Sequence, residues 1–143
     1  MLELADELAQ TGGLEQSYTV AQRVARGEAR FSVAIGTAIH WLATQHFGTE
    51  TATRFFDSLA SGAMLAETDP IFRLRNQLIA NRNAAAKLVP VSLAALVIKA
   101  LNQWASDEPM AQLSFRKDGP RPEAFPRFGK PRSPKRKREV AAD

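Results

Sequence analysis

The sequence predicts an all-α fold: a small bundle of five or six helices with a short extended arm and a disordered basic C-terminal tail. Apolar residues recur at helical spacing over most of residues 1–105, and Gly or Pro separates the periodic segments. A length of 143 residues suits a single domain. We expect a helical domain over residues 1–116 and a Pro-rich basic tail, mostly disordered, over residues 117–143.

Glycine and capping residues separate four predicted helices in the first part of the chain. The first is a short stretch that places Leu4 and Leu8 on one face and ends at Gly12. Ser32 can cap a later helix through its hydroxyl. That helix is the most apolar of the chain, and its apolar face is wide enough for the central helix of a bundle. The ranges expected after the first stretch are 14–26, 31–47 and 49–61.

Two further helices are predicted in the second part of the chain. Asp69 can cap a helix that starts with Pro70, because proline fits the first helical turn and a carboxylate is favourable there. We expect this helix, with its basic surface, to cover residues 70–87. Pro90 starts the last helix, whose apolar residues continue at helical spacing to about Ala105.

The composition changes after the last helix. Residues 110–115, MAQLSF, alternate weakly and form either a short strand or an extended arm. From about Arg127 the chain is rich in Pro and basic residues with little that could pack, so we expect disorder. Residues 1–115 carry 9 Lys or Arg and 11 Asp or Glu, a net charge of −2, whereas residues 116–143 carry 10 and 4, a net charge of +6.

The basic tail is the first candidate binding site. Clustered Lys and Arg side chains bind the phosphates of nucleic acid without sequence preference, so DNA is the expected partner. A solubilising tail and a nuclear-import address are alternatives, because short basic motifs of this kind are common. The phosphate-binding residues expected here are Lys130, Arg132, Lys135, Arg136, Lys137 and Arg138.

A second basic surface is expected over residues 70–87. Arg73, Arg75, Arg82 and Lys87 are the candidates for this surface. They could meet phosphates from one side of a helix. An ordinary solvated helix face explains the same residues equally well.

No pattern for catalysis or metal binding is apparent. His40 and His46 are six positions apart, so they do not share a helix face as an i,i+4 metal pair would, and we expect structural or surface roles for them. Phosphate-binding loops and the nucleophile elbow are absent from the sequence, as is cysteine. We therefore expect a protein without enzymatic activity, cofactor or bound metal.

The sequence also lacks membrane and secretion signals. The first residues, MLELADELAQ, are acidic and unlike a secretion signal. The longest apolar stretch, residues 88–98, is shorter than the ~20 residues that a membrane span needs and is followed by Lys99. We expect a cytoplasmic protein that does not bind membranes.

Four motifs follow one another between residues 55 and 126. They are Phe55, Phe56, Leu59 and Gly62; then Pro70, Leu74, Arg75 and Leu78; then Ala95, Leu96, Val97, Ile98, Lys99, Ala100 and Asn102; and finally Leu113, Phe115, Arg116, Gly119, Pro122, Glu123, Phe125 and Pro126. In this order they resemble the C-terminal helical region of ParB-like nuclease-domain proteins of actinobacteria and their phages. The resemblance covers roughly residues 15–126 and implies an accessory helical module that associates with DNA.

The resemblance does not extend to the N-terminal ParB/sulfiredoxin-like domain of that family. Its Asp-Gly-Gln-His-Arg type motif has no counterpart in this sequence. The resemblance therefore implies no nuclease or nucleotide-hydrolysing activity. It suggests a truncated relative or a piece of a longer or split gene, and another chain could supply the missing domain.

Two functions follow as hypotheses. The first is a non-enzymatic, DNA-associating accessory module that uses the basic tail and the surface over residues 70–87. The alternative is a protein-interaction module, an adaptor or a phage-type inhibitor, whose apolar helical surface docks on a partner or on a second copy. The near-neutral body favours the alternative, because few of its charges would face a polyanion.

Overall fold

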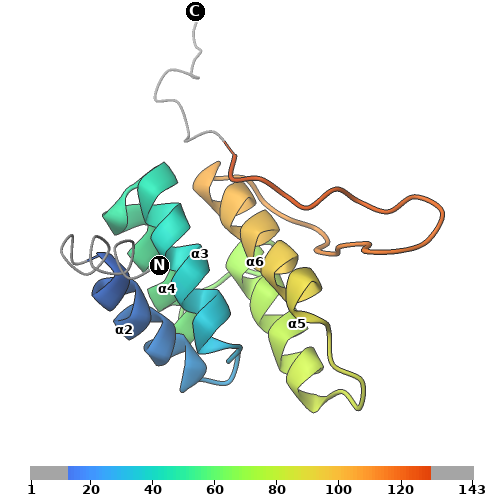
Figure 1. Ribbon diagram of the computed structural model, residues 1–143, viewed down its shortest axis with the longest axis horizontal. Coiled ribbons are helices and arrows are strands. Elements are labelled where there is room, and N and C mark those ends of the chain that lie inside the picture. The colour runs from blue at the N-terminus through green and yellow to red at the C-terminus, as the bar shows by residue number, and fades with distance from the viewer. Residues whose placement is uncertain (1–12, 130–143) are drawn as a thin grey trace, which may run out of the picture.

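The computed structural model describes residues 13–129, which form five helices and an extended C-terminal arm (Figure 1). No strand occurs among these residues, so the all-α prediction is confirmed, and residues 110–115 belong to the arm. The short stretch predicted before Gly13 and the chain from Lys130 onward lie outside the described residues. The helices are α2 (Gly13–Ala25), α3 (Val33–Phe47), α4 (Thr49–Ser61), α5 (Pro70–Asn83) and α6 (Pro90–Ala105). We call the extended segment from the end of α6 to Gly129 the arm (Figure 1), and the chain from Lys130 onward the tail.

The helices form two groups. α2, α3 and α4 pack together, α5 and α6 form a helical hairpin, and α4 contacts both members of the hairpin (Figure 1). Phe55 and Phe56 of α4 are fully buried at this junction together with Leu74 of α5 and Leu101 of α6. Leu113 of the arm joins the same core. Residues far apart in the sequence therefore build one hydrophobic core.

Local signals fix three of the helix ends as predicted. The Ser32 hydroxyl accepts a hydrogen bond from the Ile35 N–H at 3.3 Å, and Asp69 Oδ1 accepts one from the Ile71 N–H at 2.8 Å. Both are N-caps that satisfy a free donor in the first helical turn. Gly62 ends α4 with a φ of 68°, the left-handed conformation for which glycine is favoured.

Helix α5 is shorter than the predicted range 70–87. Ala84, directly after α5, has an extended backbone. The Asn81 Oδ1 atom accepts a hydrogen bond from the Leu88 N–H at 2.7 Å, so the loop folds back on the end of the helix. Lys87 therefore lies in this loop, and its inclusion in the predicted helix was wrong.

The most buried helix is α6 and not α3. Eight residues of α6 are buried, against four of α3. Helix α3 carries apolar residues on several sides, but the neighbouring helices cover only some of them. Leu42, for example, is 46% exposed. The wide apolar face of α3 thus leaves an uncovered surface and does not mark the centre of the bundle. Within residues 13–129, no helix is both long and apolar enough for a membrane span.

The extended arm is held to the hairpin by hydrogen bonds to its backbone. The Met110 N–H donates to the Thr68 carbonyl at 2.7 Å, and the Gln77 side chain donates to the Leu113 carbonyl at 2.9 Å. These contacts replace the ladder of a β-sheet, so the arm is extended without being a strand.

A loop at the end of the arm is closed by Glu123. Its Oε1 atom accepts the Arg116 N–H at 2.8 Å, and its Oε2 atom pairs with Lys99 Nζ of α6 at 2.7 Å. The Lys99 hydrogen bond is the largest cause that lowers the pKa of Glu123, followed by the Arg116 N–H. The packed part of the chain therefore continues beyond residue 116, the boundary expected from composition.

Candidate functional site

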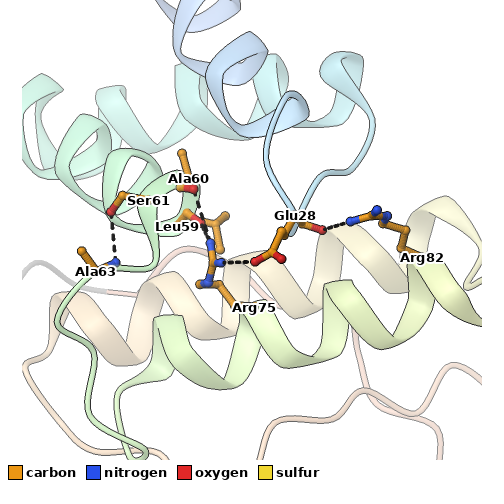
Figure 2. A network of polar contacts seen from close by, with 7 residues as sticks. All are labelled: Glu28, Leu59, Ala60, Ser61, Ala63, Arg75 and Arg82. Carbon is orange, nitrogen blue, oxygen red and sulfur yellow. Dashed lines mark hydrogen bonds and ion pairs between the residues drawn. The ribbon is translucent and has the colours of Figure 1, made fainter.

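Arg75, a predicted phosphate ligand, points into the junction between α4 and α5 (Figure 2). Its Nη1 atom donates to the carbonyl oxygens of Leu59 at 2.5 Å and Ala60 at 3.4 Å, and its Nη2 atom lies 3.5 Å from Glu28 Oε1. Both carbonyls belong to the last turn of α4, where carbonyl oxygens lack intrahelical partners and attract cations. Only 13% of the Arg75 side chain is exposed, so its guanidinium is committed to the fold.

Arg82 and Lys87 bind backbone carbonyls at the surface. Arg82 Nη1 donates to the Glu28 carbonyl at 3.1 Å, next to the Arg75 contact in Figure 2. Lys87 Nζ donates to the carbonyls of Arg82 and Ala84 at the end of α5, at 2.5 and 2.7 Å. Both residues remain exposed, so each keeps donors that a phosphate could use.

Arg73 faces a different neighbour. Its Nε atom donates to the Met110 carbonyl of the arm at 3.1 Å. Residues two positions apart on a helix do not face each other, which separates Arg73 from Arg75. The four predicted cations thus do not share one side of a helix: Arg73 and Arg75 lie on different sides of α5, and Lys87 lies in the loop after it. Arg73 and Arg75 are partly buried.

The arm carries four cations that we assigned to no site from the sequence. All four are exposed, and the arm leads directly to the predicted tail residues, which lie outside the described part of the chain. All four cations belong to the segment of net charge +6, and this charge was the signal that could have marked them as binding residues. They are Arg116, Lys117, Arg121 and Arg127.

Two of the arm cations have carboxylate neighbours among the described residues, and two have none there. Arg116 lies 3.9 Å from Glu123, and Lys117 lies 3.2 Å from Asp118. Among residues 13–129, the side chains of Arg121 and Arg127 have no ion pair or hydrogen bond. Within the described part of the chain, their positive charges are therefore not offset by a direct partner.

The end of the arm is bound by Asn102 of α6. The Asn102 Nδ2 atom donates to the Arg127 carbonyl at 2.7 Å, and its Oδ1 atom accepts the Gly129 N–H at 2.7 Å. The Gly129 carbonyl accepts a hydrogen bond from His46 Nε2, at the end of α3. Because Nε2 must be the donor in this pair, it carries the ring proton.

Phe128 reinforces these hydrogen bonds. Its ring centroid lies 5.8 Å from that of His46 and 6.1 Å from that of Phe47. Such edge and tilted contacts are favourable between aromatic rings. We call Asn102, His46 and Phe47 the clamp. The expected disorder from Arg127 therefore does not describe Arg127 to Gly129, which pack on α3 and α6.

His40 connects three helices. Its Nδ1 atom lies 2.7 Å from the Ser17 hydroxyl of α2, and its Nε2 atom lies 3.0 Å from the Thr53 hydroxyl of α4. Burial lowers the pKa of His40 from its ordinary value of 6.5, a change that Asp57 opposes and Arg23 supports. Both ring nitrogens are thus engaged in the fold. In the described part of the chain, no group of three or more His, Cys, Asp or Glu could hold a metal ion.

An apolar groove lies between α2 and α3. Its volume is about 590 Å³. Tyr18, which lines it, is 50% exposed, and Ala34 and Ala38 are exposed as well. Among the described residues, no helix covers this side of α3. Its apolar lining consists of Leu14, Tyr18, Val33, Ala34 and Ala38.

Comparison with known proteins does not test the resemblance to the ParB-like helical region, which stays a prediction. No protein-family model, no curated protein and no solved structure matches this chain.

Proposed function

We propose that this protein is a non-enzymatic, DNA-associating accessory module that contacts phosphates through the basic arm and tail. The observation that supports the proposal is the exposure of the four arm cations, which lead directly into the six tail cations. The body before residue 116 is nearly neutral, so the positive potential is concentrated in this segment. Phosphate contacts of this kind give affinity without sequence preference.

The surface over α5 would contribute fewer phosphate contacts than the arm and the tail. Arg75 and Arg73 donate to carbonyl oxygens of the chain itself, so binding a phosphate would require them to give up those hydrogen bonds. Arg82 and Lys87 are exposed and can add contacts. No catalytic role is assigned to His40, because hydroxyl groups already engage both ring nitrogens.

The salt dependence of DNA binding tests the proposal. Fluorescence anisotropy with a short labelled duplex should show tight binding that weakens with salt, since each phosphate contact adds about 0.9 to the slope of log K against log salt. Replacing the six tail cations with Gln should lower this slope by about 3 to 5 for the same reason. R121Q/R127Q should lower it by about 2.

The matched control is R26Q/R30Q. Arg26 and Arg30 are exposed, and this variant changes the net charge by the same amount as R121Q/R127Q, yet both residues lie in the loop before α3. We expect the slope to stay unchanged. Equal slopes for the wild type and for the variant with a neutral tail would overturn the proposal.

A second candidate function is protein interaction through the apolar groove. The observation that favours it is the nearly continuous apolar lining formed by α2 and α3, with Tyr18 half exposed. Exposed apolar grooves often mark binding sites. If the groove binds a second copy, sedimentation should show a concentration-dependent dimer that A38E abolishes and that A86E, in the exposed loop after α5, preserves. A monomer at every concentration would exclude self-association.

A further inference from the structure

The clamp holds an extended stretch of backbone. The Asn102 side chain offers one donor and one acceptor, and it uses them on Arg127 and Gly129, two positions apart in the arm. An amide placed in this way imitates a neighbouring β-strand. His46 binds the remaining Gly129 carbonyl. Residues from two helices therefore bind three backbone groups at the end of the arm.

The clamp is also the last fixed point before the tail. The preceding one is Glu123, which binds Lys99 and Arg116. Between them, Phe128 packs on the rings of the clamp while the Arg127 side chain stays exposed. With the clamp closed, the tail follows directly on a residue whose backbone is bound.

We propose that the clamp is a positioning device: it holds Gly129, the residue directly before the tail in the sequence, so that arm and tail cations engage one polyanion together. Opening it would free residues 124–129 and lengthen the connection between Glu123 and the tail cations by about 20 Å, at about 3.3 Å per extended residue. A longer tether lowers the effective concentration of the tail cations beside the arm cations. The inference rests on the proposed function and assigns Asn102 as its positioning residue.

Trypsin can test the clamp without DNA. Arg127 and Arg132 are both followed by residues other than Pro, whereas Arg121 and Lys130 precede Pro, which blocks cleavage. Cleavage requires the backbone to leave its hydrogen bonds. We expect cleavage after Arg127 to be at least roughly tenfold slower than after Arg132 in the wild-type chain, because the clamp binds the backbone of Arg127 and Gly129. N102A should accelerate the first cleavage about tenfold and leave the second unchanged.

The matched control is Q103A. Gln103 is the neighbour of Asn102 on α6, and it also donates to a backbone carbonyl, that of Pro109, at 2.9 Å. Its removal deletes a similar hydrogen bond away from the clamp, so cleavage after Arg127 should remain slow. Equally fast cleavage after Arg127 and Arg132 in the wild type would show that the clamp is not closed in solution and would overturn the proposal.

DNA binding then separates the inference from the proposed function. N102A keeps every cation, and we expect it to weaken duplex binding by roughly three- to tenfold and to lower the salt slope, while Q103A matches the wild type. If N102A opens the clamp and binds DNA like the wild type, the positioning role is wrong, although tail-dependent binding still supports the proposed function. If the wild-type chain itself binds no DNA, the proposed function fails and the inference fails with it.

Discussion

Replacing Arg75 with Ala is expected to lower the free energy of unfolding by about 2–4 kcal/mol, because each buried polar group left without a partner costs about 1–3 kcal/mol. The variant removes the donors that serve the Leu59 and Ala60 carbonyls at the end of α4. It also removes a long side chain that is only 13% exposed. The contact with Glu28 adds little, because that carboxylate is 77% exposed and screened by water.

Urea denaturation followed by circular dichroism measures this effect. R75K should recover part of the loss, since an ammonium can reach one carbonyl but lacks the planar fork of the guanidinium. The control is R26A, at an exposed arginine without a side-chain partner among the described residues, which should change stability by less than about 0.5 kcal/mol.

The same variant separates two interpretations of Arg75. The sequence placed it among phosphate ligands, and in that role R75A would weaken DNA binding and leave the folded state as stable as before. The contacts with α4 predict the reverse: a large loss of stability and a salt slope close to that of the wild type. An unchanged urea midpoint for R75A would contradict the structural role.

Three helix ends were predictable from the sequence because their signals are local, whereas the end of α5 was placed too late. Asp69 with Pro70, Ser32 and Gly62 each act within one helical turn, and each lies where it was expected. A hydroxyl or carboxylate at an N-cap needs no information about the rest of the chain. The same holds for the all-α class, which follows from the spacing of apolar residues.

The roles of the cations depend on tertiary contacts, and the sequence did not reveal them. The partners of Arg75 lie 15 and 16 positions away, and His46 meets Gly129 across 83 positions. The basic composition of the last part of the chain suggested disorder from Arg127. Phe128, however, packs against the rings of His46 and Phe47. The expectation that Arg73 and Arg75 meet phosphates from one side of the helix was wrong, because residues two positions apart on a helix do not face each other.

Gly62→Ala is expected to be the second strongly destabilising change, by about 2–3 kcal/mol, because an alanine in the left-handed conformation costs about 1–2 kcal/mol before any clash. A Cβ atom at Gly62 would lie 2.5 Å from Nε of Arg75 and closer still to its Cζ. A flexible side chain normally moves aside at little cost. Here the guanidinium is tied to the carbonyls of Leu59 and Ala60, so moving it breaks those hydrogen bonds.

The two changes should therefore not be additive. In an R75A background the clash is gone, and Gly62→Ala should cost only about 1–2 kcal/mol for its positive φ. Gly48→Ala is the matched control: Gly48 has a φ of 99°, and a Cβ atom added there would have no neighbouring atom within 4 Å, so its cost should be the same with or without Arg75. A double-mutant cycle in urea measures the coupling. If the losses in the free energy of unfolding for Gly62→Ala and R75A are additive, the guanidinium can move without breaking its hydrogen bonds to the α4 carbonyls. The junction between α4 and α5 would then not depend on Arg75.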